Sequence, residues 1–158
     1  MANSVRVQDV LNGSAGEAYI QMGNRRRPFM ELVEIEAKAE KNKTEVPILG
    51  KFAKPSKTTG VTLSGSATIH KMTSDFAQYM HDFIRTGQDI YFDITVTNND
   101  PTSTLGIQRI ILKNCNMDSA VIASLNADDE ILDEDFDFTF DDYEIESSFT
   151  NPIELVWT

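Results

Sequence analysis

The residues whose types and spacing could do chemistry lie in an acidic stretch near the C-terminal end of the sequence. Residues 128–146 hold eleven Asp and Glu among nineteen positions, with no Lys or Arg. Asp133, Asp135 and Asp137 stand at positions one, three and five of a twelve-residue frame, and Glu144 stands at position twelve. This is the spacing with which an EF-hand loop surrounds Ca²⁺ with carboxylate oxygens.

The residue at position six argues against a calcium loop. That position needs Gly for the sharp turn of the loop, and here it is Phe138. Phe136, Phe138 and Phe140 alternate with polar residues, and a period of two is typical of a half-buried strand. We therefore expect a strand with its three Phe side chains in the core and no bound metal. Its outward residues would be Asp135, Asp137, Thr139 and Asp141.

Other catalytic or metal-binding patterns are weak. His70, His81 and Cys115 are far apart in the sequence and lack the spacing of zinc ligands. Cys115 follows an apolar run, which favours a small buried residue over a nucleophile. The sequence has neither a P-loop nor a dinucleotide-binding glycine pattern. We expect no enzymatic activity and no cofactor.

The charge of the 158-residue chain is distributed unevenly, and this limits its partners. All fourteen Lys and Arg lie in residues 1–113 with twelve acids, a net charge of +2, whereas residues 114–158 carry thirteen acids and no cation, a net charge of −13. Because such an acidic chain has few cations to replace phosphate counterions, we expect no tight binding of nucleic acid. No apolar run approaches the ~20 residues that span a bilayer, which predicts a soluble intracellular product.

Hydrophobic periodicity predicts one mainly β domain over residues 1–158, a β-sandwich or β-barrel of seven or eight strands. Clear apolar/polar alternation marks strands over 31–41, 60–70 and 90–98. Further strands are expected over 17–22, 107–115, 120–125, 136–140 and 153–157. In the strands expected over 31–41 and 60–70, the apolar faces begin with Val33 and Val61. The opposite, polar faces hold Glu34, Glu36, Lys38 and Glu40, then Thr62, Ser64 and Ser66.

One segment follows a helical period instead. Within residues 73–86, Phe76, Met80, Phe83 and Ile84 fall on a single stripe, and Gly87 is a natural stop. This predicts one flanking helix.

Between the first two alternating strands lies a long segment, 41–60, that we expect to be an inter-strand loop. It contains five lysines and two prolines, with apolar residues such as Ile48 and Phe52 embedded among them. Loops of this length are usually functional or disordered, and the apolar content argues against disorder. We expect it to dock on something, such as another chain.

The order of these elements resembles a known family. The stretches GSATIHKMTSDFAQYMHDFIRTGQD, NDPTSTLGIQRIILKNCNMDS and EDFDFTFDDYEI are similar to tail-tube proteins of contractile-tailed phages, in particular the family of PBSX-type prophages and phage-tail-like bacteriocins. The resemblance covers about residues 13–143. Residues 147–158 depart from it and look like a C-terminal extension.

The resemblance implies a structural subunit of a virion tail tube. Such subunits form hexameric rings that stack into a hollow conduit for DNA and tape-measure protein, without specific DNA binding. Sheath, tape-measure and baseplate or initiator proteins are implied partners, and the host cytoplasm is the place of synthesis. The long loop would reach the next ring, which in this sequence points to Lys51, Phe52, Lys54 and Lys57.

The resemblance also gives the acidity a role, because a negative wall repels phosphate. The polar faces, from Glu34 to Glu40 and from Thr62 to Ser66, would suit a wetted lumen. Asp135, Asp137 and Asp141 would either line the lumen or meet lysines at ring contacts. Two alternatives remain: the tube of another, type VI-like contractile injection system, and a monomeric acidic β-sandwich that binds calcium or a small ligand.

Overall fold

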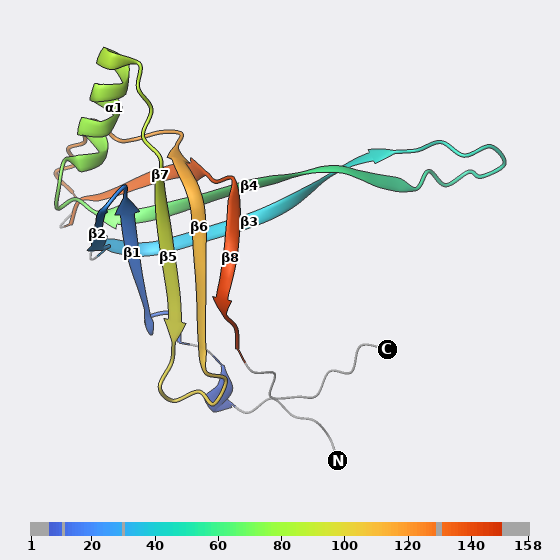
Figure 1. Cartoon of the computed structure of the whole chain (residues 1–158), viewed down its shortest axis with the longest axis horizontal. Coiled ribbons are helices and arrows are strands. Elements are labelled where there is room, and N and C mark those ends of the chain that lie inside the picture. Colours follow the sequence, from blue (N-terminus) through green and yellow to red (C-terminus); the bar gives the residue numbers. More distant parts are fainter. Residues whose placement is uncertain (1–6, 11, 30, 129–130, 150–158) are drawn as a thin grey trace.

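The structure is a computed structural model that describes residues 7–10, 12–29, 31–128 and 131–149. In this part of the chain, eight strands and one α-helix follow a short 3₁₀ turn at Val7–Asp9 (Figure 1). The strands are β1 (Gly16–Met22), β2 (Arg25–Pro28), β3 (Leu32–Glu45), β4 (Ser56–His70), β5 (Phe92–Asn99), β6 (Ile107–Met117), β7 (Asp133–Thr139) and β8 (Asp142–Ser147), and the helix is α1 (Asp75–Thr86).

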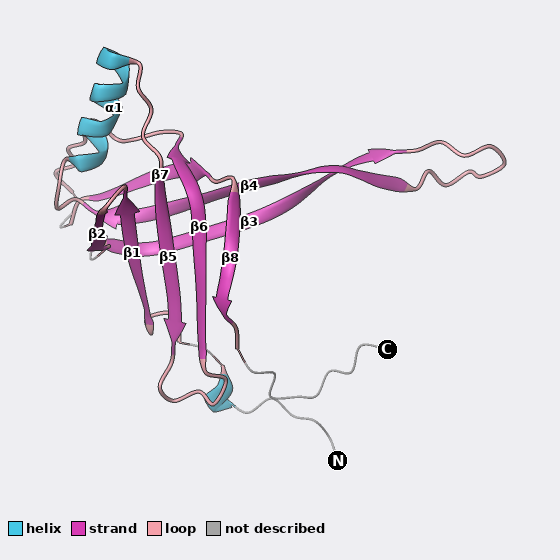
Figure 2. Ribbon diagram, viewed as in Figure 1, coloured by secondary structure: helices cyan, strands magenta, loops and turns pink. Residues whose placement is uncertain are grey.

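All strand pairs are antiparallel, in the order β2-β1-β5-β6-β7-β4-β3, with β8 also paired to β6. The sheet folds over at β6. The earlier part of β6 pairs with β5 and β8, whereas Asn116 and Met117 pair with β7. Figure 2 shows the result: β1, β5, β6 and β8 lie side by side along one axis, alternating in direction, and β3, β4 and β7 cross them.

The core fills the space between these two groups of strands. Alternate residues of β7 are buried, so Phe136, Phe138 and Phe140 form a row of rings with centroids about 6 Å apart. Ile94 of β5 and Cys115 of β6 belong to the same core cluster and are fully buried. The strand predicted over 136–140 is confirmed, with its Phe side chains inside.

Position 65 of β4 requires glycine, because the backbone there lies very close to the Phe138 ring of this row. A Cβ at Gly65 would lie 2.5 Å from ring atom Cζ of Phe138 and 2.7 Å from the carbonyl oxygen of Glu36. No side chain fits there, and the Phe138 ring covers the glycine.

Helix α1 ends where its sequence predicts, and it begins at Asp75, two residues inside the predicted segment 73–86. Gly87 adopts the left-handed conformation (φ 73°) and donates its N–H to the carbonyl of Phe83, which is a common way to end a helix. Phe76, in the first turn, is buried and stacks on Phe136 with centroids 4.8 Å apart. The later turns extend away from the sheet, so the predicted apolar stripe is buried only at its beginning (Figure 1).

Half of the segment predicted as a loop over 41–60 is strand. β3 continues to Glu45 and β4 starts at Ser56, so only residues 46–55 form a loop. Residues 40–62, which we call the arm, extend far beyond the rest of the sheet (Figure 1). The sequence does not show this extension of the strands, because its threonine and lysine residues give no clear alternation of apolar and polar positions.

Two other sequence predictions differ from the structure. Residues 120–125 form no strand: Ile122 and Leu125 are exposed and pair with nothing in the described sheet. Conversely, β8 was not predicted, because its apolar residues Tyr143 and Ile145 are too few to show a pattern and both are exposed. The strand expected over 153–157 and the extension after residue 149 lie outside the described residues.

Candidate assembly surfaces

The tip of the arm, residues 46–55, exposes apolar and basic side chains together. Leu49 and Phe52 are fully exposed, and Val46 and Ile48 are exposed as well. Lys51, Lys54 and Lys57 are also exposed. The tip is nevertheless ordered by its own backbone: Val46 N–H donates to Pro55 O (2.8 Å), Lys51 N–H donates to Ile48 O (3.1 Å), and Gly50 takes φ 84°. An ordered loop that exposes large apolar side chains marks a site of protein contact.

The polar residues of β3, β4 and β7 share one surface, which we call the polar face. Residues directly opposite in an antiparallel pair point to the same side, and the registers Glu36↔Ser66↔Asp137 and Lys38↔Ser64↔Thr139 join the three strands. A hydrogen bond from Thr68 Oγ1 to Asp135 Oδ1 (2.7 Å) fixes the same relation. The polar face comprises Glu34, Glu36, Lys38, Glu40, Thr62, Ser64, Ser66, Thr68, Asp133, Asp135, Asp137 and Thr139.

The polar face therefore unites two groups of residues that the sequence left separate. Asp135 and Asp137 share this face with Glu34 and Glu36, on the other side of the intervening strand β4, whereas Asp141 does not belong to the face. Asp141 follows β7 in the turn to β8, where Asn114 Nδ2 donates to its carboxylate (3.4 Å). Six acids and one lysine give the polar face a strongly negative charge.

The opposite side of the arm base is apolar and exposed. The register aligns Ala37 with Gly65 and Ala39 with Leu63, next to the buried Phe138. Ala37 and Ala39 are exposed and Leu63 is half-buried, while Val61 further out is exposed. The alternation in the sequence predicts a face buried within the subunit, but the core ends before these residues do.

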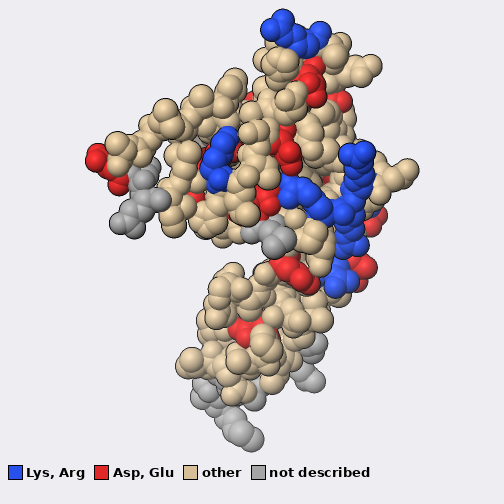
Figure 3. Space-filling model, turned by 90° about the vertical axis from the view of Figure 1, so that its left-hand side faces the viewer, with Lys and Arg blue, Asp and Glu red and all other residues tan. Residues whose placement is uncertain are grey.

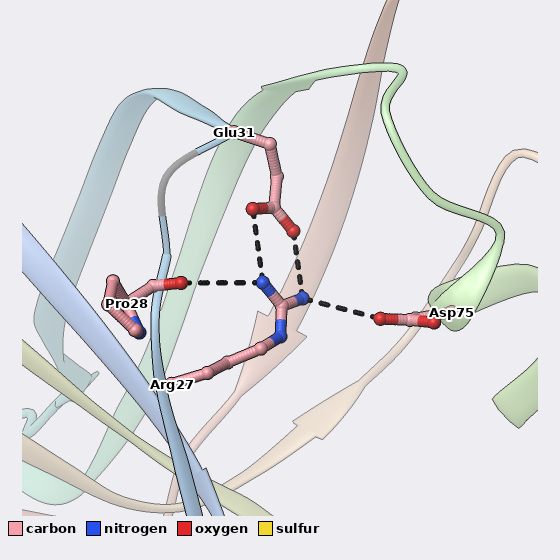
Figure 4. Close-up of polar contacts among 4 residues, drawn as sticks. All are labelled: Arg27, Pro28, Glu31 and Asp75. Atoms are coloured by element: carbon pink, nitrogen blue, oxygen red, sulfur yellow. Dashed lines mark hydrogen bonds and ion pairs between the residues drawn. The ribbon is translucent and has the colours of Figure 1, made fainter.

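An ion cluster around Arg27 lies where β3 begins, at the end of that strand away from the arm (Figure 4). The Arg27 guanidinium, from β2, donates to both carboxylate oxygens of Glu31 (2.8 and 3.1 Å), to the carbonyl of Pro28 (3.4 Å) and to Asp75 at the start of α1 (3.5 Å). Glu31 is 3% exposed. Burial alone would raise the pKa of Glu31, but the hydrogen bonds and charge of Arg27 outweigh it, so this pKa is lowered.

The Arg27 cluster thus connects three elements of the fold. Glu31 immediately precedes β3, Arg27 lies on β2, and Asp75 begins α1. Sequence reasoning missed this cluster, because Arg27 and Asp75 are 48 positions apart and only the folded topology brings them together.

Charged side chains are unevenly spread over the end of the molecule opposite the arm. Figure 3 shows Lys and Arg over the upper part, while the lower part carries few charges. Arg25, Arg26 and Arg27 occupy β2, the last strand of the sheet, and Pro28 ends it. Charges and proline on an edge strand disfavour pairing with another strand.

The residues considered for metal or nucleophilic chemistry lie on strands, on the helix or in the core. Asp133, Asp135 and Asp137 lie on the extended strand β7, not in a calcium loop. His70 Nδ1 lies 2.6 Å from Asp133 Oδ1, whereas His81 is exposed on α1. Cys115 is fully buried, and burial raises its pKa to about 12. Among the described residues, no three His, Cys, Asp or Glu side chains are placed to hold a metal ion.

The fold and these surfaces define a structural protein that presents an arm, a negative face and exposed apolar contacts for assembly. The chain belongs to the phage tail tube protein family, whose model matches residues 3–146. It is 36% identical over 142 residues to the phage-like element PBSX protein XkdM of Bacillus subtilis (strain 168), covering 90% of this chain and 94% of that protein. The resemblance to the PBSX-type family is confirmed.

Solved structures show the same fold at low identity. The cap of the anti-feeding prophage tube gives a TM-score of 0.63 at 13% identity, covering 92% of this chain and 97% of that one. A sheath–tube complex of an extracellular contractile injection system gives 0.60 at 12% identity, covering 82% and 88%. The mainly β fold with one helix is thus that of tail tubes, and the chain is a structural subunit of this class. No helix in the described residues is long and apolar enough to cross a membrane.

Proposed function

We propose that six copies of this chain form a ring and that rings stack into the hollow tail tube of a virion or phage-like particle. The observation that carries the proposal is the arm, which holds exposed apolar and basic side chains well away from the rest of the subunit. A contact between one end of a subunit and a different surface of the next is heterologous, and it continues as a filament instead of closing. Lys51, Phe52, Lys54 and Lys57 are the residues of the arm that make this contact.

The polar face lines the bore. It is extended, wetted and negative, so phosphates passing along it meet repulsion and gain nothing from counterion release. Glu34, Glu36, Lys38 and Glu40 of β3 and Thr62, Ser64 and Ser66 of β4 form most of it, and Asp135 and Asp137 continue it onto β7. Asp141, outside the polar face, serves a contact and not the lumen. DNA and tape-measure protein would then pass without adhering.

The remaining partners follow from the same assembly. A sheath surrounds the tube, and a baseplate or initiator protein begins it, with the subunit synthesised in the host cytoplasm before it enters the particle. A tube in another contractile injection system is the second candidate, favoured by the fold shared with a sheath–tube complex. Neighbouring genes for a sheath and a tape measure, together with head proteins, would favour a phage tail.

Negative-stain electron microscopy with light scattering tests the proposal. Purified protein at high concentration, with and without a baseplate extract, should give rings or hollow tubes whose unit has the mass of six 17.7 kDa chains. Monomers under every condition would overturn it. A thermal shift with Ca²⁺ on such monomers would instead support the ligand-binding alternative.

A further inference from the structure

A hollow beside α1 lies at the opposite end of the molecule from the arm. It has a volume of about 330 Å³ and is formed by the helix, by the segment that follows it, and by the end of β6. Its lining residues include Tyr79, Met80, Phe83, Ile90 and Met117. Figure 1 places α1 and the arm tip at opposite ends of the long axis, so the arm of one subunit cannot reach its own hollow.

The hollow and its surroundings carry apolar side chains that the fold leaves uncovered. Phe83 on its wall is 41% exposed, and the adjacent Ile84 and Tyr91 are 67% and 55% exposed. Large apolar residues on neighbouring positions of a monomer surface indicate a contact with another protein.

The charge around the hollow is negative. Asp89 and Asp118 belong to its lining and are exposed, and Asp82 lies on the same helix. Among residues 75–92 there is one cation, Arg85, against three acids. The arm has the complementary composition, because residues 41–57 carry five lysines and one glutamate around Leu49 and Phe52.

We infer that the hollow beside α1 is the receptor for the arm tip of a second copy of this chain. Phe52 and its apolar neighbours cover Phe83 and Met80, while Lys51 and Lys54 meet Asp89 and Asp118. Because the donor and the receptor occupy opposite ends of one subunit, each copy offers one of each, and the contact repeats along an axis. This inference rests on the proposed stacking and names the surface that receives the arm.

A larger hollow, of about 670 Å³ between β1 and the start of β3, fits the tip less well. Its walls include Ala18 and Phe29, which are already buried, and Val33 is its one strongly exposed apolar residue. Covering it would therefore remove less apolar surface from water and stabilise a contact less.

Charge reversal tests the pairing in the full-length protein. The donor variant Lys51→Glu/Lys54→Glu and the receptor variant Asp89→Lys/Asp118→Lys should each raise the concentration needed for tubes at least about tenfold, because like charges then face each other. All four changes together should restore tubes. The matched control Asp128→Lys/Asp142→Lys changes the net charge as the receptor variant does but lies outside the hollow, and should leave tubes intact.

The outcomes separate this inference from the proposed function. Normal tubes from the receptor variant, equal loss in the control, or no rescue by the fourfold variant would overturn the inference alone. Rings that persist without stacking in the donor and receptor variants support it. A wild type that never assembles overturns both.

Disulfide trapping locates the contact directly. Ala53→Cys leaves Phe52 and the lysines in place, and Gln88→Cys is exposed next to Asp89. Oxidised tubes of the double variant should give a ladder of covalent multimers that disappears on dilution before oxidation. Ala53→Cys with Ile145→Cys, on β8, should give no ladder, and the buried Cys115 does not compete. Tubes without a ladder from the first pair would contradict the docking.

Discussion

Replacing Arg27 by Ala should destabilise the subunit by leaving the buried Glu31 carboxylate without its partner. Removing one member of a fully buried ion pair costs about 3–5 kcal/mol. The Arg27 side chain is 40% exposed, so water partly screens this pair, and we expect a loss of about 2 kcal/mol. For a chain of this size that corresponds to a melting temperature lower by about 4–8 °C.

The pH dependence of this loss identifies its cause. The pKa of Glu31 is lowered in the folded state, so its pairing stabilises the protein fully above the unfolded pKa, near 4.5, and this contribution is lost as pH falls through the folded pKa. Without Arg27, burial raises the pKa of Glu31 instead, and protonation then relieves the unpaired charge. The difference in stability between Arg27→Ala and wild type should therefore shrink as pH falls through the raised pKa of the variant and continue to shrink below 4.5.

Urea denaturation of both proteins at pH 7 and at pH 3.5, below the concentration for assembly, measures this difference. Glu31→Gln keeps the shape and removes the charge, so the double variant Arg27→Ala/Glu31→Gln should lose less than the sum of the two single variants. An Arg27→Ala protein as stable as wild type, or one equally destabilised at both pH values, would refute the reasoning.

Other predictions concern the core and the polar face. Gly65→Ala should cost about 3 kcal/mol, the upper end for overpacking, because its Cβ meets the Phe138 ring and rigid backbone; full stability by urea denaturation would contradict the close approach. Phe138→Ala should cost about 3–5 kcal/mol in the same assay, since the ring is fully buried. Cys115 should react with a thiol reagent at pH 8 only after unfolding, because burial raises its pKa to about 12; labelling of the native protein would argue against this. Asp135→Asn/Asp137→Asn should leave tube assembly unchanged by electron microscopy if these residues line the bore, whereas loss of stacking would assign them to a ring contact.

Strand and helix positions were predictable where apolar residues enter the core. The alternation of Phe136, Phe138 and Phe140 and the stop at Gly87 report local backbone geometry, and both are confirmed. The run over 120–125 is also rich in apolar residues, yet it finds no partner strand in the described sheet. Whether an apolar run pairs depends on distant parts of the chain, which periodicity does not report.

The sequence predicted which residues form the candidate surfaces, but not where these surfaces lie on the fold. The sequence indicates the polar sides of residues 31–41 and 60–70, and the acids of 128–146, separately. Their union into one face depends on β7 pairing beside β4 in the register Ser66↔Asp137. The hollow beside α1 could not be predicted, since it requires the end of β6 to lie against the helix.

The exposed alternation at the base of the arm is itself evidence for assembly. A strand that only supported the subunit core would lose its apolar alternation where the core ends, near the contact of Gly65 with Phe138. Instead the pattern continues through Ala39 and Val61, which are exposed in the isolated subunit. Small side chains such as Ala allow another backbone to approach closely. Apolar periodicity that outlasts the core therefore supports the proposed assembly, in which another copy would cover this surface, and in this chain it runs along the side of the arm opposite the negative polar face.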